Sequence, residues 1–113
     1  MSEFQTKFDP LVHEVVKNIP EGQVMTYAAV ARKAGYPRHA RMVGKALFRC
    51  NKELPWHRVI KSDSTLAFPP SSYNYQKQKL LLETEGNKLI DGKVIPAKVS
   101  VEKNLDELIW GPE

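Results

Sequence analysis

The sequence is poor in the residues that bind metals or form disulfides. Its 113 residues include one cysteine, Cys50, so neither an internal disulfide nor a thiolate metal cluster can form. Three histidines are scattered along the chain, and no two of them have a ligand spacing such as i, i+4. We therefore expect a protein without a metal site and without a cofactor.

Long apolar runs are absent as well. No stretch approaches the roughly 20 residues that are needed to span a bilayer. The first residues, Met1-Ser2-Glu3-Phe4, carry an acid where a secretory signal has basic and apolar residues. These absences predict an intracellular protein with no membrane partner, nuclear in a eukaryote and in the cytoplasm or nucleoid of a bacterium.

The length and composition are those of one folded domain. Hydrophobic residues make up 42% of the chain and charged residues 27%, which is ordinary for a globular protein. A chain of 113 residues is long enough for one modest core. It has no internal repeat, no linker and no obvious dimerisation element. We expect one monomeric domain over residues 1–113.

Positive charge is concentrated in the middle of the chain. The formal net charge is +4 and the isoelectric point is near 9.2. Between residues 32 and 58 the cations are opposed by Glu53 alone. This concentration favours a localised surface for a polyanion over an evenly solvated surface. The cations are Arg32, Lys33, Arg38, Arg41, Lys45, Arg49, Lys52 and Arg58.

A first helix is predicted near the N-terminus. Asp9-Pro10 is typical of an N-cap followed by proline at the first helical position. Apolar residues then recur at helical spacing as far as Ile19, and Pro20-Glu21-Gly22 ends the run. The apolar stripe indicates a helix of the core.

The next two predicted helices form a helix-turn-helix. Thr26 can cap a helix over residues 27–34, and Gly35 is a typical left-handed terminator. A third helix is predicted to begin at Pro37, with apolar residues along one face and cations on the others. Two helices joined by a short turn that includes a glycine are the helix-turn-helix pattern. The basic second helix favours a role in nucleic-acid binding.

The second half of the chain predicts a wing beside these helices. Residues 58–60 suggest a short strand, and the serine- and proline-rich residues 61–72 an exposed loop. A fourth helix is expected over 74–85, followed by a hairpin over 88–95 with a two-residue Asp-Gly turn. The apolar tail, 105–110, is expected to dock on the core. The fold class is mainly α, a single winged helix-turn-helix domain with a small β-hairpin.

The most distinctive segment is Pro55-Trp56-His57-Arg58-Val59-Ile60. It resembles the active-site motif Pro-Cys-His-Arg-Val of the O6-alkylguanine-DNA alkyltransferases, with tryptophan in the place of the cysteine. That replacement is the defining mark of the alkyltransferase-like proteins. Other segments follow in the family's order and near its spacing, over about residues 5–112, and imply the fold of the family's C-terminal DNA-binding domain. They are Gly22-Gln23-Val24-Met25-Thr26-Tyr27, Ala40-Arg41-Met42-Val43-Gly44-Lys45-Ala46-Leu47, Gln76-Lys77-Gln78-Lys79-Leu80, Glu85-Gly86 and Trp110-Gly111-Pro112.

The resemblance implies recognition of damage without repair chemistry. An alkyltransferase moves the alkyl group onto an activated cysteine thiolate, and an indole has no comparable nucleophilicity. His57 and Glu85 match the residues that help to make the thiolate, and we expect them to form a structural hydrogen-bonded pair. Cys50, six residues before Trp56, has no recognisable base beside it. We interpret it as a packing residue.

Recognition of a lesion at O6 implies base flipping, because a stacked base cannot be fully inspected. By resemblance, Arg41 is the finger that enters the stack and takes the place of the extruded base. Tyr27 matches the tyrosine that helps to rotate and hold the flipped nucleotide. Each residue also has an ordinary interpretation: Arg41 as a solvated helix arginine, and Tyr27 as a core tyrosine.

The resemblance also implies that this helix-turn-helix enters the minor groove, where the degenerate base pattern avoids sequence preference. Small residues on the helix would let its backbone approach the duplex. Apolar side chains would add contacts, and cations would meet phosphates. The small residues are Ala40 and Gly44, the apolar ones Pro37 and Met42, and the cations Arg32, Arg38 and Lys45.

The predicted lesion pocket departs from the family pattern in the loop that follows the motif. The backbone carbonyls of Trp56 and Val59 would accept from the guanine amino group, and the Trp56 ring would face the alkyl substituent. Several family members carry an arginine over the flipped base, and Pro69 stands at that position here. A cation–π contact of about 1 kcal/mol would be missing. Phe68 would either stack on the base instead or serve in packing.

The resulting hypothesis is a non-enzymatic sensor of O6-alkylguanine in double-stranded DNA. The family resemblance implies that it hands the lesion to nucleotide excision repair proteins. Two other classes fit parts of the sequence. An enzyme, either an alkyltransferase through Cys50 or a glycosylase or nuclease, needs a nucleophile or a pair of carboxylates, and only Glu85 is apparent. A sequence-specific winged-helix transcription factor would favour Asn or Gln on the recognition helix, and residues 38–49 contain neither.

Overall fold

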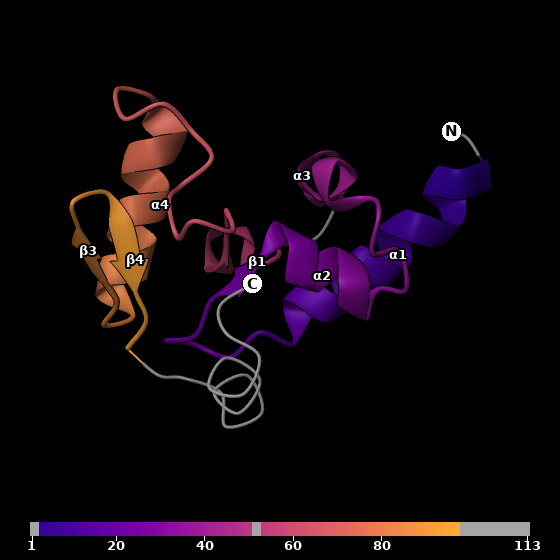
Figure 1. Ribbon diagram of the computed structural model, residues 1–113, viewed down its shortest axis with the longest axis horizontal. Helices are drawn as coiled ribbons and strands as arrows, with labels where there is room; N and C mark the ends of the chain where they lie inside the picture. The colour runs from indigo at the N-terminus through magenta and orange to yellow at the C-terminus, as the bar shows by residue number, and fades with distance from the viewer. Residues whose placement is uncertain (1–2, 51–52, 98–113) are drawn as a thin grey trace.

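The computed structural model describes residues 3–50 and 53–97, which form two packed groups of elements (Figure 1). One group is made by three helices from the first half of the chain: α1 (Glu3–Lys17), α2 (Tyr27–Lys33) and α3 (Ala40–Phe48). The other comprises α4 (Tyr73–Thr84) and the hairpin of β3 (Lys88–Ile90) and β4 (Lys93–Ile95). Between them lie β1 (Met25–Thr26), the single-turn 3-10 helix η1 (Trp56–Arg58) and β2 (Val59–Ile60). The predicted mainly helical architecture with a small hairpin is confirmed.

Helix α1 begins earlier than the sequence predicted. We expected Asp9 to cap a helix that starts at Pro10, but α1 runs from Glu3 and contains Pro10 in its interior. Phe4 and Phe8 extend the helical apolar spacing upstream, and their rings stack with centroids 4.8 Å apart. Burial of Phe8 in the core favours helix there, although proline lacks the N–H that bonds to the carbonyl four residues earlier.

Asp9 instead anchors the end of α3. Its side chain is 6% exposed and accepts two hydrogen bonds from Arg49, from Nε at 2.6 Å and from Nη2 at 2.8 Å. The hydrogen bond from Arg49 holds the pKa of Asp9 below its usual value. One turn further along α1, His13 Nε2 lies 2.6 Å from the carbonyl oxygen of Ala46. Helix α1 thereby fixes the position of the last turn of α3.

Asp9→Asn is expected to lower the midpoint of thermal unfolding by several degrees. An amide has no charge and only one acceptor oxygen, so it cannot replace the bidentate carboxylate that binds the Arg49 guanidinium. A protein loses stability when one partner of a buried ion pair is removed. Thermal unfolding followed by circular dichroism would measure the change. Glu14→Gln, an exposed acid on the same helix, is the matched control and should leave the midpoint unchanged. An Asp9→Asn protein as stable as its parent would contradict the anchoring role.

Helix α2 starts and stops where its sequence signals predict. Thr26 Oγ1 accepts a hydrogen bond from the N–H of Ala29 at 3.1 Å, which caps the helix. Gly35 follows with φ +92°, a left-handed conformation that glycine adopts without strain. The helix ends at Lys33, and Ala34 is its C-cap. These local signals decide the boundaries because they depend on residues only a few positions apart.

Helix α3 begins at Ala40, three residues later than predicted. Residues 36–39 form a turn, closed by a 2.9 Å hydrogen bond from the N–H of His39 to the carbonyl of Tyr36. The fixed φ of Pro37 suits the second position of such a turn as well as it suits a helix start. The ring of Tyr36 packs edge-on against Phe8 at 5.2 Å, so tertiary packing favours the turn.

Two short strands join the groups. Strand β1 pairs in parallel with β2, Met25 beside Val59 and Thr26 beside Ile60. The sequence predicted β2 one residue too long and did not predict β1, since two residues show no alternation.

Helix α4 lies one residue earlier than predicted. Ser72 caps it, because the Ser72 hydroxyl accepts a 3.1 Å hydrogen bond from the N–H of Tyr75.

The hairpin is as predicted. Lys88 pairs with Ile95, and the turn residues Asp91 and Gly92 have φ of 52° and 78°. Positive φ at both positions is the mark of the type I′ turn, which the Asp-Gly pair favours. The tail that was expected to dock on the core, 105–110, lies outside the described residues.

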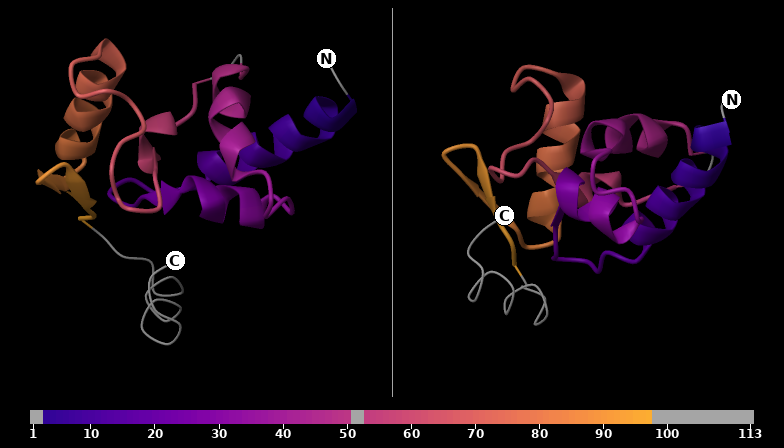
Figure 2. Two further views of the ribbon diagram at one scale, coloured as in Figure 1. Left: turned by 45° about the horizontal axis from the view of Figure 1, so that its top comes forward. Right: turned by 45° about the vertical axis from the view of Figure 1, so that its right-hand side comes forward.

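The two groups of elements stay distinct in all three views (Figures 1 and 2), and each has its own apolar core. The larger core joins α1, α2 and α3, and the smaller one joins α4, β2 and the hairpin. The two residues of β2 belong to different cores, Val59 to the larger and Ile60 to the smaller, and Val24, just before β1, belongs to the smaller. No helix of the described residues is long and apolar enough to cross a membrane. Within 3–50 and 53–97, no three His, Cys, Asp or Glu side chains gather as metal ligands.

Candidate nucleic-acid interface

A cavity of about 1000 Å³ opens between the helix-turn-helix and the loop that follows β2. Tyr27 at the start of α2, the face of α3 and the loop on either side of Asp63 form its walls. The cavity is therefore bounded by three segments that lie far apart in the sequence. Its lining residues are Tyr27, Ala28, Ala40, Arg41, Gly44, Lys45, Phe48, Arg49, Lys61, Ser62, Asp63, Ala67 and Phe68.

The α3 wall combines small residues with exposed cations. Arg41 and Lys45 are one helical turn apart and both are exposed. Ala40 and Gly44 lie beside them, and a Cβ built on Gly44 would lie 3.9 Å from the Tyr27 ring. A side chain longer than a methyl group at position 44 would meet that ring. The small residues thus keep the floor of the cavity open, and the cations stand at its edge.

Tyr27 is half-buried at the junction of α2 and α3. Burial raises the pKa of its phenol above the usual value of 10.0, so the hydroxyl keeps its proton at neutral pH. The ring packs against the larger core, and the residue also lines the cavity. Both interpretations drawn from the sequence, core tyrosine and pocket tyrosine, are therefore compatible with its position.

Three aromatic rings cluster at the other end of the cavity. Phe68, from the loop after β2, lies edge-on to Trp56 with centroids 6.0 Å apart. Phe48, from the last turn of α3, lies 6.3 Å from Phe68 and 6.4 Å from Trp56. Phe48 and Phe68 line the cavity, whereas Trp56 is not among its lining residues and packs against the larger core. Phe48 was not singled out in the sequence, because a Phe at a helix end is an ordinary core residue.

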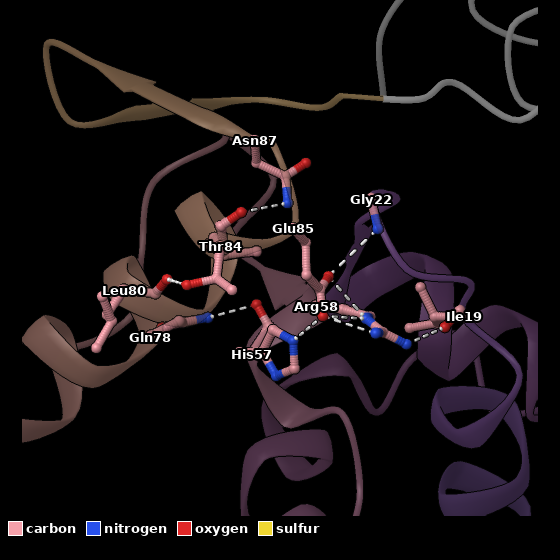
Figure 3. Close-up of polar contacts among 10 residues, drawn as sticks. Ile19, Gly22, His57, Arg58, Gln78, Leu80, Thr84, Glu85 and Asn87 are labelled. Atoms are coloured by element: carbon pink, nitrogen blue, oxygen red, sulfur yellow. Dashed lines mark hydrogen bonds and ion pairs between the residues drawn. The ribbon is translucent and has the colours of Figure 1, made fainter.

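The motif histidine and the distant glutamate are hydrogen-bonded, as the sequence analysis expected. His57 Nε2 lies 2.7 Å from Glu85 Oε2, and both side chains are about one-tenth exposed (Figure 3). The structure adds a partner that we did not expect: Arg58 donates from Nη2 to Glu85 Oε2 at 2.6 Å and from Nε to Oε1 at 3.0 Å. A further bond, from the N–H of Gly22 at 3.2 Å, completes the shell of Glu85.

This network fixes the charge of Glu85. Burial raises its pKa, but the hydrogen bonds from Arg58, His57 and Gly22 together lower it by more, to about 2. Arg58 also donates from Nη1 to the carbonyl of Ile19 at 2.7 Å. The network therefore ties together the turn after α1, the η1 motif and the end of α4 (Figure 3). Its arrangement indicates a structural brace between the two groups of elements.

A buried glutamine supports the motif from the other side. Gln78 of α4 is 1% exposed, and its Nε2 donates to the carbonyls of His57 and Val59, each at 3.1 Å. The carbonyl of Trp56 accepts from the N–H of Val59. The carbonyls of Trp56 and Val59 each accept one hydrogen bond already. To bind a guanine amino group, either carbonyl would have to accept a second hydrogen bond, and the two lone pairs of a carbonyl oxygen allow this. The sequence analysis named Gln78 only as part of a family segment and gave it no role, because it lies in a polar run.

The cavity gathers about half of the residues that the sequence assigned to the two sites. It brings together Tyr27, Phe68, Ala40, Arg41, Gly44 and Lys45. The other predicted residues are not in its lining. Of these, His57 and Val59 are buried, Glu85 is in the brace, Met42 packs against the larger core, and Pro37 and Arg38 are exposed on the turn before α3. Their assignments to lesion or DNA binding stay predictions.

Comparison with known proteins agrees with this architecture. Residues 7–87 match the family model described as 6-O-methylguanine DNA methyltransferase, DNA binding domain. Alkyltransferase-like protein 1 of Schizosaccharomyces pombe is 40% identical over 99% of this chain and 98% of its own length. The DNA base-flipping protein of Escherichia coli is 42% identical over 72% of this chain and 64% of its own length. The crystal structure of S. pombe Atl1 with damaged DNA containing O6-carboxymethylguanine superposes with a TM-score of 0.66 and 37% identity, over 91% of this chain and 94% of that one.

Proposed function

The chain belongs to the alkyltransferase-like family, and from that premise we propose that it is a non-enzymatic sensor of O6-alkylguanine in double-stranded DNA. One observation carries the proposal: the cavity opens beside the exposed cations of α3. The resemblance of the motif places Trp56 at the position of the family's nucleophile. A flipped base needs a hollow that is reached from the duplex surface. The lesion would enter from α3 and keep its alkyl group, because the motif supplies no thiolate.

The route into the cavity is proposed to run from the minor groove. Arg41 would enter the base stack as the nucleotide rotates out, and its guanidinium would stack on the neighbouring bases. Lys45 and Arg38 would meet phosphates on either side. Tyr27 would contact the rotating nucleotide from the junction of α2 and α3. A protein that binds the bent DNA with its flipped nucleotide, and does not remove the alkyl group, marks the lesion by staying bound to it. We propose that nucleotide excision repair proteins recognise this complex.

A titration combined with mass analysis tests the function. Short duplexes that contain guanine, O6-methylguanine or a larger O6-alkylguanine at one position would be titrated with the protein. We expect tighter binding to both alkylated duplexes than to the guanine duplex. After incubation, the protein should show no gain of mass and the DNA should retain its adduct.

Two outcomes would favour the alternatives. Equal affinity for all duplexes would contradict lesion sensing and favour a general winged-helix DNA-binding protein. An alkyl group recovered on Cys50 would show an alkyltransferase. Cys50 is partly buried and is not in the lining of the cavity, so the geometry favours an unmodified thiol.

A further inference from the structure

We propose that Lys61 binds a DNA phosphate that reaches it only when the damaged nucleotide has rotated out of the duplex. The inference rests on the proposed function and adds a contact that distinguishes the flipped complex from ordinary binding to the DNA surface. Lys61 is the first residue after β2 and lies just beyond the basic segment 32–58 of the sequence. The concentration of charge in that segment therefore does not imply its role.

The position of Lys61 in the cavity is the first argument. The other cations that line the cavity belong to α3 or are its C-cap, Arg49, whereas Lys61 is exposed on the wall that the loop after β2 forms. Arg49 is already bound to Asp9 by two hydrogen bonds. Among the described residues, the Lys61 ammonium forms no hydrogen bond or ion pair. It is therefore available to an anionic ligand at this wall.

The backbone around Lys61 is held in place, which is the second argument. The N–H of Lys61 donates to the carbonyl of Thr65 at 2.9 Å, and the N–H of Ser64 donates to the carbonyl of Lys61 at 2.9 Å. The hairpin holds the same turn, because the N–H of Val94 donates to the carbonyl of Ser64 at 2.8 Å and Thr65 forms a β-bridge with Lys93. A turn that is already ordered loses little backbone entropy when its side chain binds a ligand.

An acid beside Lys61 is the third argument. Asp63 also lines the cavity, and its Oδ1 accepts hydrogen bonds from the Thr65 hydroxyl at 2.5 Å and from the Thr65 N–H at 3.1 Å. The bond from the hydroxyl is the largest cause of a lowered pKa at Asp63, so the carboxylate is charged at neutral pH. Like charges repel, so Asp63 opposes the approach of a phosphate to this wall and Lys61 favours it. The two residues are expected to change DNA affinity in opposite directions.

The geometry of base flipping connects this wall to the lesion. A flipped nucleotide rotates about its own backbone, so its sugar and flanking phosphates are displaced toward the cavity together with the base. In a stacked duplex that is docked on α3, we expect the phosphates to meet the cations of that helix instead. The Lys61 contact is therefore expected in the complex with damaged DNA and not in the complex with intact DNA.

Lys61→Ala tests this contact on an O6-methylguanine duplex and a guanine duplex, with affinities measured by fluorescence anisotropy at several salt concentrations. We expect the affinity for the lesion duplex to fall about fivefold, the loss of one partly exposed charged contact. The dependence of that affinity on salt should fall by about one counterion. Neither quantity should change for the guanine duplex. Lys61→Arg keeps the charge and should bind both duplexes as the parent does.

Asp63→Asn should have the opposite effect. The amide oxygen can still accept from Thr65, so the turn is kept, but the repulsion is removed and the lesion duplex should bind about threefold more tightly. Lys88→Ala is the matched control, because Lys88 is an exposed lysine on β3 that does not line the cavity. It should leave both affinities unchanged. The midpoint of thermal unfolding of every variant should equal that of the parent.

Unchanged lesion binding by Lys61→Ala would overturn the inference. So would an equal loss of affinity for both duplexes, which would show a phosphate contact that is made without flipping. Weaker lesion binding by Asp63→Asn would contradict the opposed charges of this wall. If the parent itself binds the two duplexes equally, lesion sensing fails, and the Lys61 contact fails with it.

Discussion

Arg41→Ala is expected to weaken binding to an O6-methylguanine duplex by roughly 30-fold, or about 2 kcal/mol, the usual loss at a binding hot spot. Arg41 is exposed on α3 and lines the cavity. If the base is extruded into this cavity as proposed, we expect the gap that it leaves in the stack to lie within reach of this side chain. Alanine provides neither the planar guanidinium nor its hydrogen bonds. Fluorescence anisotropy with labelled duplexes would measure both affinities.

Arg38→Ala is the matched control for the finger. Arg38 is exposed on the turn just before α3 but does not line the cavity. Its loss should weaken binding to damaged and intact duplexes alike, and should reduce the dependence of affinity on salt by about one counterion. Arg41→Ala should instead weaken binding to the lesion duplex more than binding to the guanine duplex. Its midpoint of thermal unfolding should equal that of the parent. Equal lesion binding by parent and Arg41→Ala would refute the finger.

Glu85→Ala is expected to remove about 3 kcal/mol of folding free energy, the loss usual when one partner of a buried ion pair is removed. The side chain is 10% exposed and accepts bonds from Arg58, His57 and the Gly22 N–H. Without it, the 15% exposed Arg58 keeps its charge but loses its anion. Urea unfolding at neutral pH would measure the difference. An unchanged stability would show that the brace contributes nothing.

The same carboxylate predicts how stability depends on acid. The pKa of Glu85 is about 2 in the folded protein, against an ordinary value of 4.5. A lowered folded-state pKa means that the ionised group stabilises the fold above pH 4.5, and that this contribution is lost as the pH falls toward 2. The difference corresponds to about 3 kcal/mol.

Glu85→Gln is the variant that isolates this effect. Its stability should fall less steeply between pH 4.5 and 2 than that of the parent, because the amide does not titrate. Glu83→Gln, an exposed acid two positions earlier on α4, should follow the parent curve. Identical pH profiles for Glu85→Gln and the parent would contradict the assignment. Because none of the brace residues lines the cavity, lesion selectivity at neutral pH should persist in any Glu85 variant that stays folded.

The sequence by itself determined the features that depend on near neighbours. Thr26 and Gly35 set the ends of α2, and the Asp91-Gly92 pair set the hairpin turn, since a cap or a turn is satisfied within four residues. The motif around Trp56 predicted the family, which the comparisons confirm, and the absence of the acceptor thiol stays a prediction. The predicted start of α1 was wrong. Asp9-Pro10 is a valid local signal for a helix start, but the packing of Phe8 in the core outweighs it.

Only the tertiary structure decided which distant side chains meet. Asp9 and Arg49 are 40 positions apart, and Gly22 and Glu85 are 63 apart. Sequence patterns report the face of a helix or strand, but not which residue of another segment lies opposite. The predicted pair of His57 and Glu85 therefore proved to include Arg58, whereas Trp56 packs against the larger core and its assignment to the substituent stays a prediction. Hydrogen bonds and ring contacts reach only a few ångströms, so they become visible once the chain has folded.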